Sequence, residues 1–229
     1  MAEQSKNRLR DNAIRHILFD VDGPVVTFLT KAGELILLSI MWILTCLPVI
    51  TIGAASAALY HTVVKSVRHG IGYPVRSYFG NFRRLLKRGI IATIPLIVCA
   101  VLMFLFNRYV AHVEISLSTF AAKVLVIFTI IVTSVTVYLF PIISRFRVSV
   151  GRAVMMAFIV SGQHFFVTLL HVAALGGLVY TAFYILPIPS LFILPAILCY
   201  LSSLLMEKVL RKYMPDKPDE GSEALWLYE

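Results

Sequence analysis

The chain has 229 residues, of which 59% are hydrophobic and 14% are charged, and its net charge is +9. Soluble domains carry about 25% charged residues, so this composition excludes an ordinary soluble domain and predicts an all-α membrane protein with several spans. The positive charge is typical of the cytoplasmic loops of membrane proteins, and it gives no reason to expect a nucleic-acid partner.

The N-terminal segment, residues 1–30, is polar and basic, and we interpret it as cytoplasmic and interfacial. It contains no short apolar core of the kind found in a cleavable signal peptide. The stretch FDVDGP at Phe19–Pro24 is similar to the DxDG start of haloacid-dehalogenase-type phosphatases. That chemistry needs a soluble α/β domain downstream, whereas here an apolar run follows, so the stretch predicts a turn into the first span.

The apolar run from Val25 to Lys65 is about twice as long as the roughly 20 residues that one span needs. It is either one overlong helix or a hairpin. Basic residues lie on both sides of it, and only a hairpin keeps both groups in the cytoplasm. Because Pro48 suits the first turn of a helix and disfavours helical geometry before it, we predict helices at Lys31–Leu47 and Pro48–Lys65. The second of these could be re-entrant instead of spanning.

Four further spans follow in chain order. They are predicted at Ile90–Phe106, Phe120–Phe140, Phe165–Leu186 and Leu191–Met206. With both termini in the cytoplasm, all of the 21 Lys and Arg except Arg108 and Lys123 lie on or near the inner side. The predicted architecture is a bundle of about six membrane segments over residues 31–207, followed by an acidic cytoplasmic tail, residues 208–229.

Small residues four positions apart let helix backbones approach closely. In the second segment, Gly53 is paired in this way with Ala57, and Ala54 with Ala58. Ala173 and Gly177 repeat the spacing in the fifth span. We predict that these residues pack helices together, within the bundle or against a partner subunit.

The cytoplasmic connection before the third span predicts an amphipathic basic helix. Its candidate contact residues are Phe79, Phe82, Arg83, Arg84, Lys87 and Arg88. The next inner connection has the same character, with Arg145 and Arg147. Such a surface either anchors the protein to anionic lipid headgroups or docks a cytoplasmic protein.

The motifs of an enzyme are missing from the sequence. His164 and His171 share a helix face, but no carboxylate or cysteine joins them, and the three cysteines stand at unrelated spacings. Glu34, beside Lys31, is the one acidic residue inside a predicted span, so the charged relay groups of a coupled transporter are also missing. We therefore predict a non-enzymatic protein with no catalytic residues, no cofactor and no metal.

The order of these motifs resembles the YesL-like family of small bacterial membrane proteins. The resemblance is carried by Leu47-Pro48, Thr51-Ile52-Gly53, Ala57-Ala58-Leu59-Tyr60, Phe79, Phe82, Phe140-Pro141 and Arg145-Phe146. Members of that family have no established function and are typically encoded among carbohydrate ABC importers and glycoside-degrading enzymes. The resemblance implies an accessory subunit of an oligosaccharide importer in the bacterial plasma membrane. Its partners would be permease subunits, and through them an ATPase and a sugar-binding protein. A self-contained permease for a small solute is the chief alternative, and an envelope scaffold unconnected with sugar is a more remote one.

Overall fold

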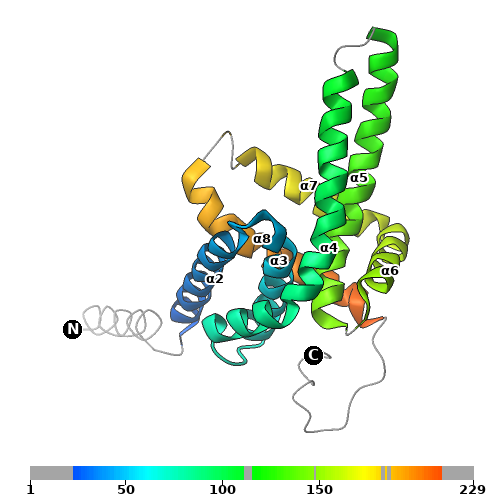
Figure 1. The fold of residues 1–229 in the computed structure, drawn as a ribbon. Helices are drawn as coiled ribbons and strands as arrows, with labels where there is room; N and C mark the ends of the chain where they lie inside the picture. Colours follow the sequence, from blue (N-terminus) through cyan, green and yellow to red (C-terminus); the bar gives the residue numbers. More distant parts are fainter. Residues whose placement is uncertain (1–22, 111–114, 147, 182–183, 185–186, 213–229) are drawn as a thin grey trace, which may run out of the picture.

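The computed structural model describes residues 23–110, 115–146, 148–181, 184 and 187–212. The N-terminal segment up to residue 22, Arg147 and the tail from residue 213 lie outside the described residues. Within the described part of the chain every regular element is a helix, which confirms the predicted all-α class (Figure 1). The elements are α2 (Pro24–Cys46), η1 (Val49–Thr51), α3 (Ile52–Thr62), η2 (Val63–Arg68), α4 (Pro74–Val110), α5 (Ile115–Arg145), α6 (Val150–Gln163), α7 (Phe165–Tyr180) and α8 (Pro187–Arg211).

Four of the described helices are long and apolar enough to cross a membrane. These stretches are Val25–Cys46, Pro74–Tyr109, Phe120–Arg145 and Phe192–Leu210. A fifth span results if α6 and α7, which meet at an angle of 102°, count as one broken span. The structure thus gives four or five candidate spans where the sequence predicted six.

Large apolar side chains on these helices face outward. Phe28 is 71% exposed, Leu102 60% and Phe104 65%. In the most apolar stretch of α4 only 17% of the residues are buried. A water-soluble protein rarely leaves a continuous apolar surface of this size uncovered. The helices therefore have the surface of membrane-crossing segments, as the composition predicted.

The predicted second segment is a short helix inside the protein. The chain turns at Pro48 through the single turn η1, and α3 then runs for 11 residues before it continues into the π-helical η2. One side of α3 and η2, with Ala57 and Tyr60, joins a core with α4, α5, α6 and α8. The other side, with Ala58 and Leu59, joins a second core with α2, α4 and α8. Since both cores share it, α3 is the centre of the bundle.

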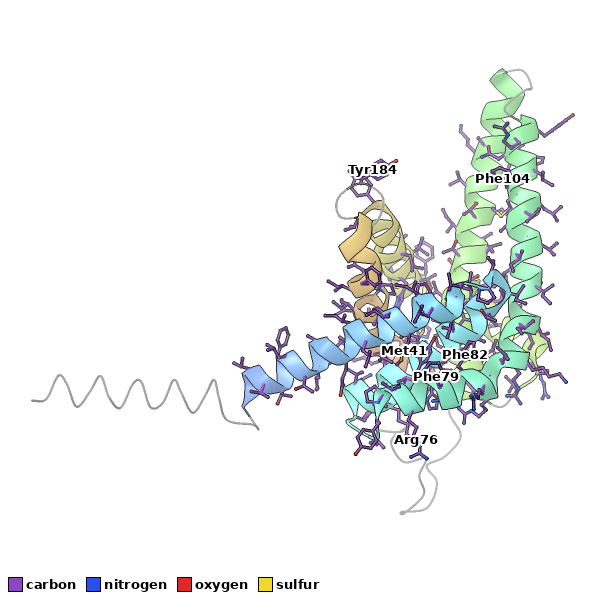
Figure 2. The ribbon with its side chains drawn as sticks, turned by 60° about the vertical axis from the view of Figure 1, so that its left-hand side comes forward. Met41, Arg76, Phe79, Phe82, Phe104 and Tyr184 are labelled. Atoms are coloured by element: carbon purple, nitrogen blue, oxygen red, sulfur yellow. The ribbon has the colours of Figure 1, made fainter. Side chains whose placement is uncertain are left out.

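The predicted basic helix and the predicted third span are one continuous helix, α4. Both views show that α4 is bent: its first part, which carries Phe79 and Phe82, runs across the long upright part that carries Phe104 (Figures 1 and 2). The first part is fixed to α2, where the Tyr78 hydroxyl lies 2.6 Å from Thr45 Oγ1. The sequence analysis divided this stretch into a surface helix and a separate span, whereas the structure has one continuous helix, Pro74–Val110.

The predicted fifth span begins at a bend: α6 ends at Gln163, and α7 starts at Phe165 at an angle of 102° to it. The Thr168 hydroxyl lies 3.0 Å from the carbonyl oxygens of Ser161 and His164, and 3.1 Å from the hydroxyl of Tyr138 on α5. The Thr168 hydroxyl can donate to one of these oxygens and thereby connect α7 with α6 and α5 at the bend. These contacts of Thr168 stabilise the bend between α6 and α7 against α5.

Candidate functional site: a buried ion-pair cluster and a basic helix face

The small residues predicted for helix packing in α3 lie where the backbones of α3 and α4 are closest. Gly53, Ala54, Ala57 and Ala58 are all buried. A Cβ atom added to Gly89 of α4 would lie 2.5 Å from the Ala54 backbone. A Cβ atom added to Gly53 would collide with Thr93 of α4 and with Phe140 of α5. Any larger side chain at these glycines would therefore separate the two helices.

A hydroxyl of α4 caps the beginning of α3. The first backbone N–H groups of a helix have no partner within the helix. Here the N–H of Gly53 donates to Thr93 Oγ1 at 3.1 Å, and the Thr93 hydroxyl donates to the Gly89 carbonyl at 2.8 Å. Further along α3, the Asn81 side-chain amide lies 3.0 Å from His61 Nδ1. Polar contacts as well as close packing therefore fix α3 on α4.

The corresponding residues of the fifth span are placed differently. Ala173 and Gly177 are exposed, and a Cβ atom added to Gly177 would meet nothing within 4 Å. The structure therefore does not bring this pair against another helix of the same chain.

The candidate contact residues of α4 divide between its buried and exposed sides. Phe79 is 44% exposed, whereas Phe82 is half-buried and stacks on the buried Tyr78 with ring centroids 6.3 Å apart. Of the basic residues, Arg83, Arg84 and Lys87 are exposed and Arg88 is half-buried. Figure 2 shows Arg76, at the start of the helix, extending away from the ribbon. We call Phe79, Arg83, Arg84 and Lys87 the basic face.

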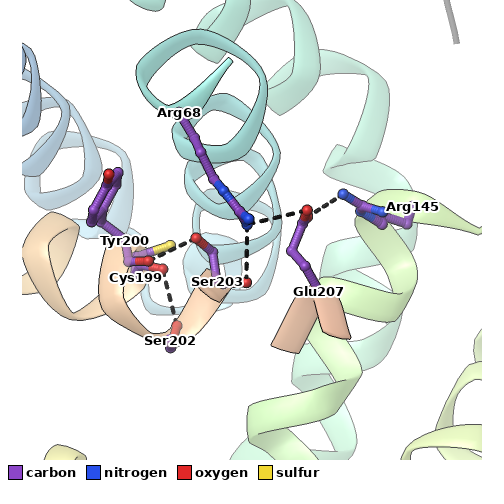
Figure 3. A network of polar contacts seen from close by, with 7 residues as sticks. All are labelled: Arg68, Arg145, Cys199, Tyr200, Ser202, Ser203 and Glu207. Atoms are coloured by element: carbon purple, nitrogen blue, oxygen red, sulfur yellow. Dashed lines mark hydrogen bonds and ion pairs between the residues drawn. The ribbon is translucent and has the colours of Figure 1, made fainter. Parts of the chain in front are cut away.

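Arg145 does not belong to a contact surface, which corrects the prediction for this residue. Its side chain is 1% exposed and forms an ion pair with Oε1 of Glu207. Oε2 of the same carboxylate lies 3.2 Å from Nη1 of Arg68. Arg68 also donates to the Ser203 carbonyl, at 3.4 Å (Figure 3). The buried guanidinium of Arg145 is therefore paired with a buried carboxylate, that of Glu207.

The three residues of this ion-pair cluster, Arg68, Arg145 and Glu207, come from η2, α5 and α8. The Glu207 side chain is 1% exposed and that of Arg68 is 23% exposed. A buried charge is costly unless it is paired and hydrogen-bonded, and each carboxylate oxygen here has its own guanidinium partner. Oε1 is hydrogen-bonded to Arg145, whereas Oε2 is within ion-pair distance of Arg68 without a hydrogen bond. The arrangement suits a fixed connection between three helical elements.

Glu207 is a residue of the candidate site that the sequence analysis did not identify. It was placed just beyond the sixth span, whereas α8 continues to Arg211. A signal was available, because Glu207 is four residues after Ser203 and three before Leu210, and all three share one helix face. Ser203 and Leu210 are buried too. Apolar residues after Glu207 therefore indicated that the helix and its buried face continue.

The two histidines have different surroundings. His171 is buried, and its Nδ1 lies 2.8 Å from the Val167 carbonyl, while His164 is at the bend that ends α6. Nowhere in the described ranges do three or more His, Cys, Asp or Glu side chains gather in a way that could hold a metal ion.

Part of the chain matches a known protein family. Residues 35–107 match the family described as "Protein of unknown function, DUF624". No curated protein and no solved structure matches the chain. The DUF624 match covers about a third of the chain and contains about half of α2, all of α3 and most of α4. It includes the close contact between Gly89 and Ala54, the basic face and Arg68, whereas Arg145 and Glu207 lie outside it.

Proposed function

We propose that this chain is a non-enzymatic membrane subunit of a carbohydrate ABC importer, which packs against the permease subunits and associates through them with an ATPase and a sugar-binding protein. The DUF624 match supports the similarity of this chain to a family of proteins, but the function of that family is unknown. The link to importers comes from the YesL-like resemblance of the motifs. The proposal includes a plasma-membrane location, six membrane segments and cytoplasmic termini.

The basic face is the observation that carries the proposal. Phe79 is an aromatic side chain left 44% exposed between exposed arginines, on a helix whose opposite side is held in the core by Tyr78 and Leu85. Protein interfaces are enriched in aromatic residues and arginine, and a few such residues contribute most of the binding energy. A rigid helix that presents them is suited to bind a partner protein at the membrane surface.

The partner can be tested by purification from cells that also express the neighbouring importer genes. We expect Phe79→Ala, or Arg83→Lys combined with Arg84→Lys, to recover about fivefold less permease, which corresponds to about 1 kcal/mol of binding energy. Lysine keeps the attraction to lipid headgroups but lacks the planar guanidinium group. The matched control is Phe104→Ala, an exposed phenylalanine on the upright part of α4. The proposal fails if the unaltered protein recovers no importer subunit and its deletion leaves oligosaccharide uptake unchanged.

The proposed topology is testable with single cysteines in a chain whose native cysteines are replaced. Tyr73, in the loop before α4, is 80% exposed, and it would face the cytoplasm. An impermeant thiol reagent added to intact cells should modify His112→Cys, between the third and fourth predicted spans, but not Tyr73→Cys. Modification of Tyr73→Cys alone would reverse the assignment of sides.

One observation favours the alternative function, a self-contained permease for a small solute. A cavity of about 560 Å³ lies between α2, α3, α5, α7 and α8, and this is within the size range of small-molecule sites. Two results together would favour this alternative: the unaltered protein purifies without importer subunits, and its deletion leaves sugar uptake unchanged.

A further inference from the structure

The cavity between α2, α3, α5, α7 and α8 has walls of a distinct chemistry. Side chains of leucine, valine, alanine and aromatic residues supply most of the lining. The lining includes Trp42 of α2, Val137 of α5, Ala174 of α7 and Pro195 of α8. A sugar or an ion would need several polar groups directed into the site.

Most polar groups of the lining are already engaged or covered. The Trp42 indole N–H donates to Ser56 Oγ at 3.3 Å, the Thr136 hydroxyl to the Val132 carbonyl at 2.7 Å, and the Ser202 hydroxyl to the Cys199 carbonyl at 3.0 Å. The Tyr60 hydroxyl oxygen and His171 Nε2 have no hydrogen-bond partner among the described residues, but both atoms are buried and so contribute almost nothing to the surface of the cavity. The surface that a ligand would touch is therefore almost entirely apolar.

The cavity lies among helices that have the surface of membrane-crossing segments. α2, α5 and α8 each contain a candidate span. Its rim includes Leu170, 56% exposed, and Leu201, 53% exposed, so it opens toward the surface that lipid covers. Water is not stable in an apolar cavity of this kind, and an unfilled space would forfeit the dispersion contacts of its walls.

We propose that this cavity is a binding site for one acyl chain of a membrane lipid, which enters past Leu170 and Leu201 and lies against Trp42. The proposal is independent of the importer function, because it needs only the walls of the cavity and a surrounding bilayer. The bound chain would complete the apolar core between α7 and the central helices. It would therefore be retained when the protein is extracted in mild detergent.

Trp42 can report on the occupant. The chain has two tryptophans, so Trp226→Phe leaves Trp42 as the only one. In vesicles of phosphatidylcholine with brominated acyl chains, the fluorescence of Trp42 should be quenched strongly. Ala174→Phe or Val137→Phe, each of which fills part of the cavity, should remove most of this quenching. Ala173→Phe is the matched control, because it adds the same ring at the neighbouring exposed position that does not line the cavity, and it should leave the quenching unchanged.

Two results would overturn the proposal. Equal quenching in Ala174→Phe, Val137→Phe and Ala173→Phe would mean that lipid reaches Trp42 only from outside the cavity. Strong quenching by acrylamide without quenching by bromine would mean that the cavity holds water, as a solute pathway requires. Native mass spectrometry supplies an independent measurement: the unaltered protein should carry one lipid molecule that Ala174→Phe loses and Ala173→Phe keeps.

Discussion

Glu207→Ala should lower the free energy of unfolding by about 3–5 kcal/mol, because it leaves two guanidinium groups without their carboxylate. Most of this loss should come from the unpaired guanidinium of Arg145, because its side chain is only 1% exposed. The side chain of Arg68 is 23% exposed and can turn toward solvent. We therefore expect Arg68→Ala to destabilise the protein less than Arg145→Ala. Thermal unfolding in detergent, followed by loss of monodispersity, measures the order of the three variants.

The control for the ion-pair cluster is a double replacement. Arg145→Met with Glu207→Leu removes both buried charges and keeps apolar volume, so it should recover most of the stability lost in Glu207→Ala. Lys208→Ala, at the neighbouring exposed position, should have little effect. If Glu207→Ala unfolds at the same temperature as Lys208→Ala, the buried pairing does not contribute to stability.

Gly89→Leu should also be strongly destabilising, by about 3 kcal/mol, at the upper end of the usual cost of overpacking. Even a Cβ atom at this position would lie 2.5 Å from the Cα atom and the backbone nitrogen of Ala54. Backbone atoms cannot rotate away as the end of a side chain can, so α3 must move off α4. That movement would also break the hydrogen bond from the Gly53 N–H to Thr93 Oγ1.

Gly80→Leu is the matched control for Gly89→Leu, because it makes the same change in the same helix where nothing lies within 4 Å. Its effect should be small or favourable, since leucine has the higher helix propensity. Equal melting temperatures for the two variants would contradict the close approach of α3 and α4.

The elements that could be predicted from the sequence are those whose signal is local. Long apolar runs predicted four of the spans, and Pro48 predicted the turn before α3. The length of α3 could not be predicted in this way, because Ala and Gly suit both a membrane helix and a buried packing helix, and only the surrounding helices decide. The bend at His164 depends on Thr168 and on Tyr138 of another helix, a contact that no local pattern reveals.

For the candidate site, the sequence indicated the charges but not their environment. The exposed positions of Arg83 and Lys87 agree with the amphipathic pattern of α4. Arg145 has the same character in the sequence and yet is buried, because its partner Glu207 is 62 residues away. Pairing over such a separation is a property of the assembled bundle, so an arginine at the end of an apolar helix cannot be classified from its neighbours alone.

The central position of α3 has a consequence for how the protein is made. The 11 residues of α3 are about 17 Å long, so the segment approaches the thickness of a hydrocarbon layer, about 30 Å, only together with η2, which continues it to Arg68. When α3 leaves the ribosome, the helices that surround it, α4, α5 and α8, have not yet been synthesised. Its native contacts therefore form only after these later segments have entered the bilayer. The ion-pair cluster is completed only when α8 brings Glu207 to Arg68 and Arg145.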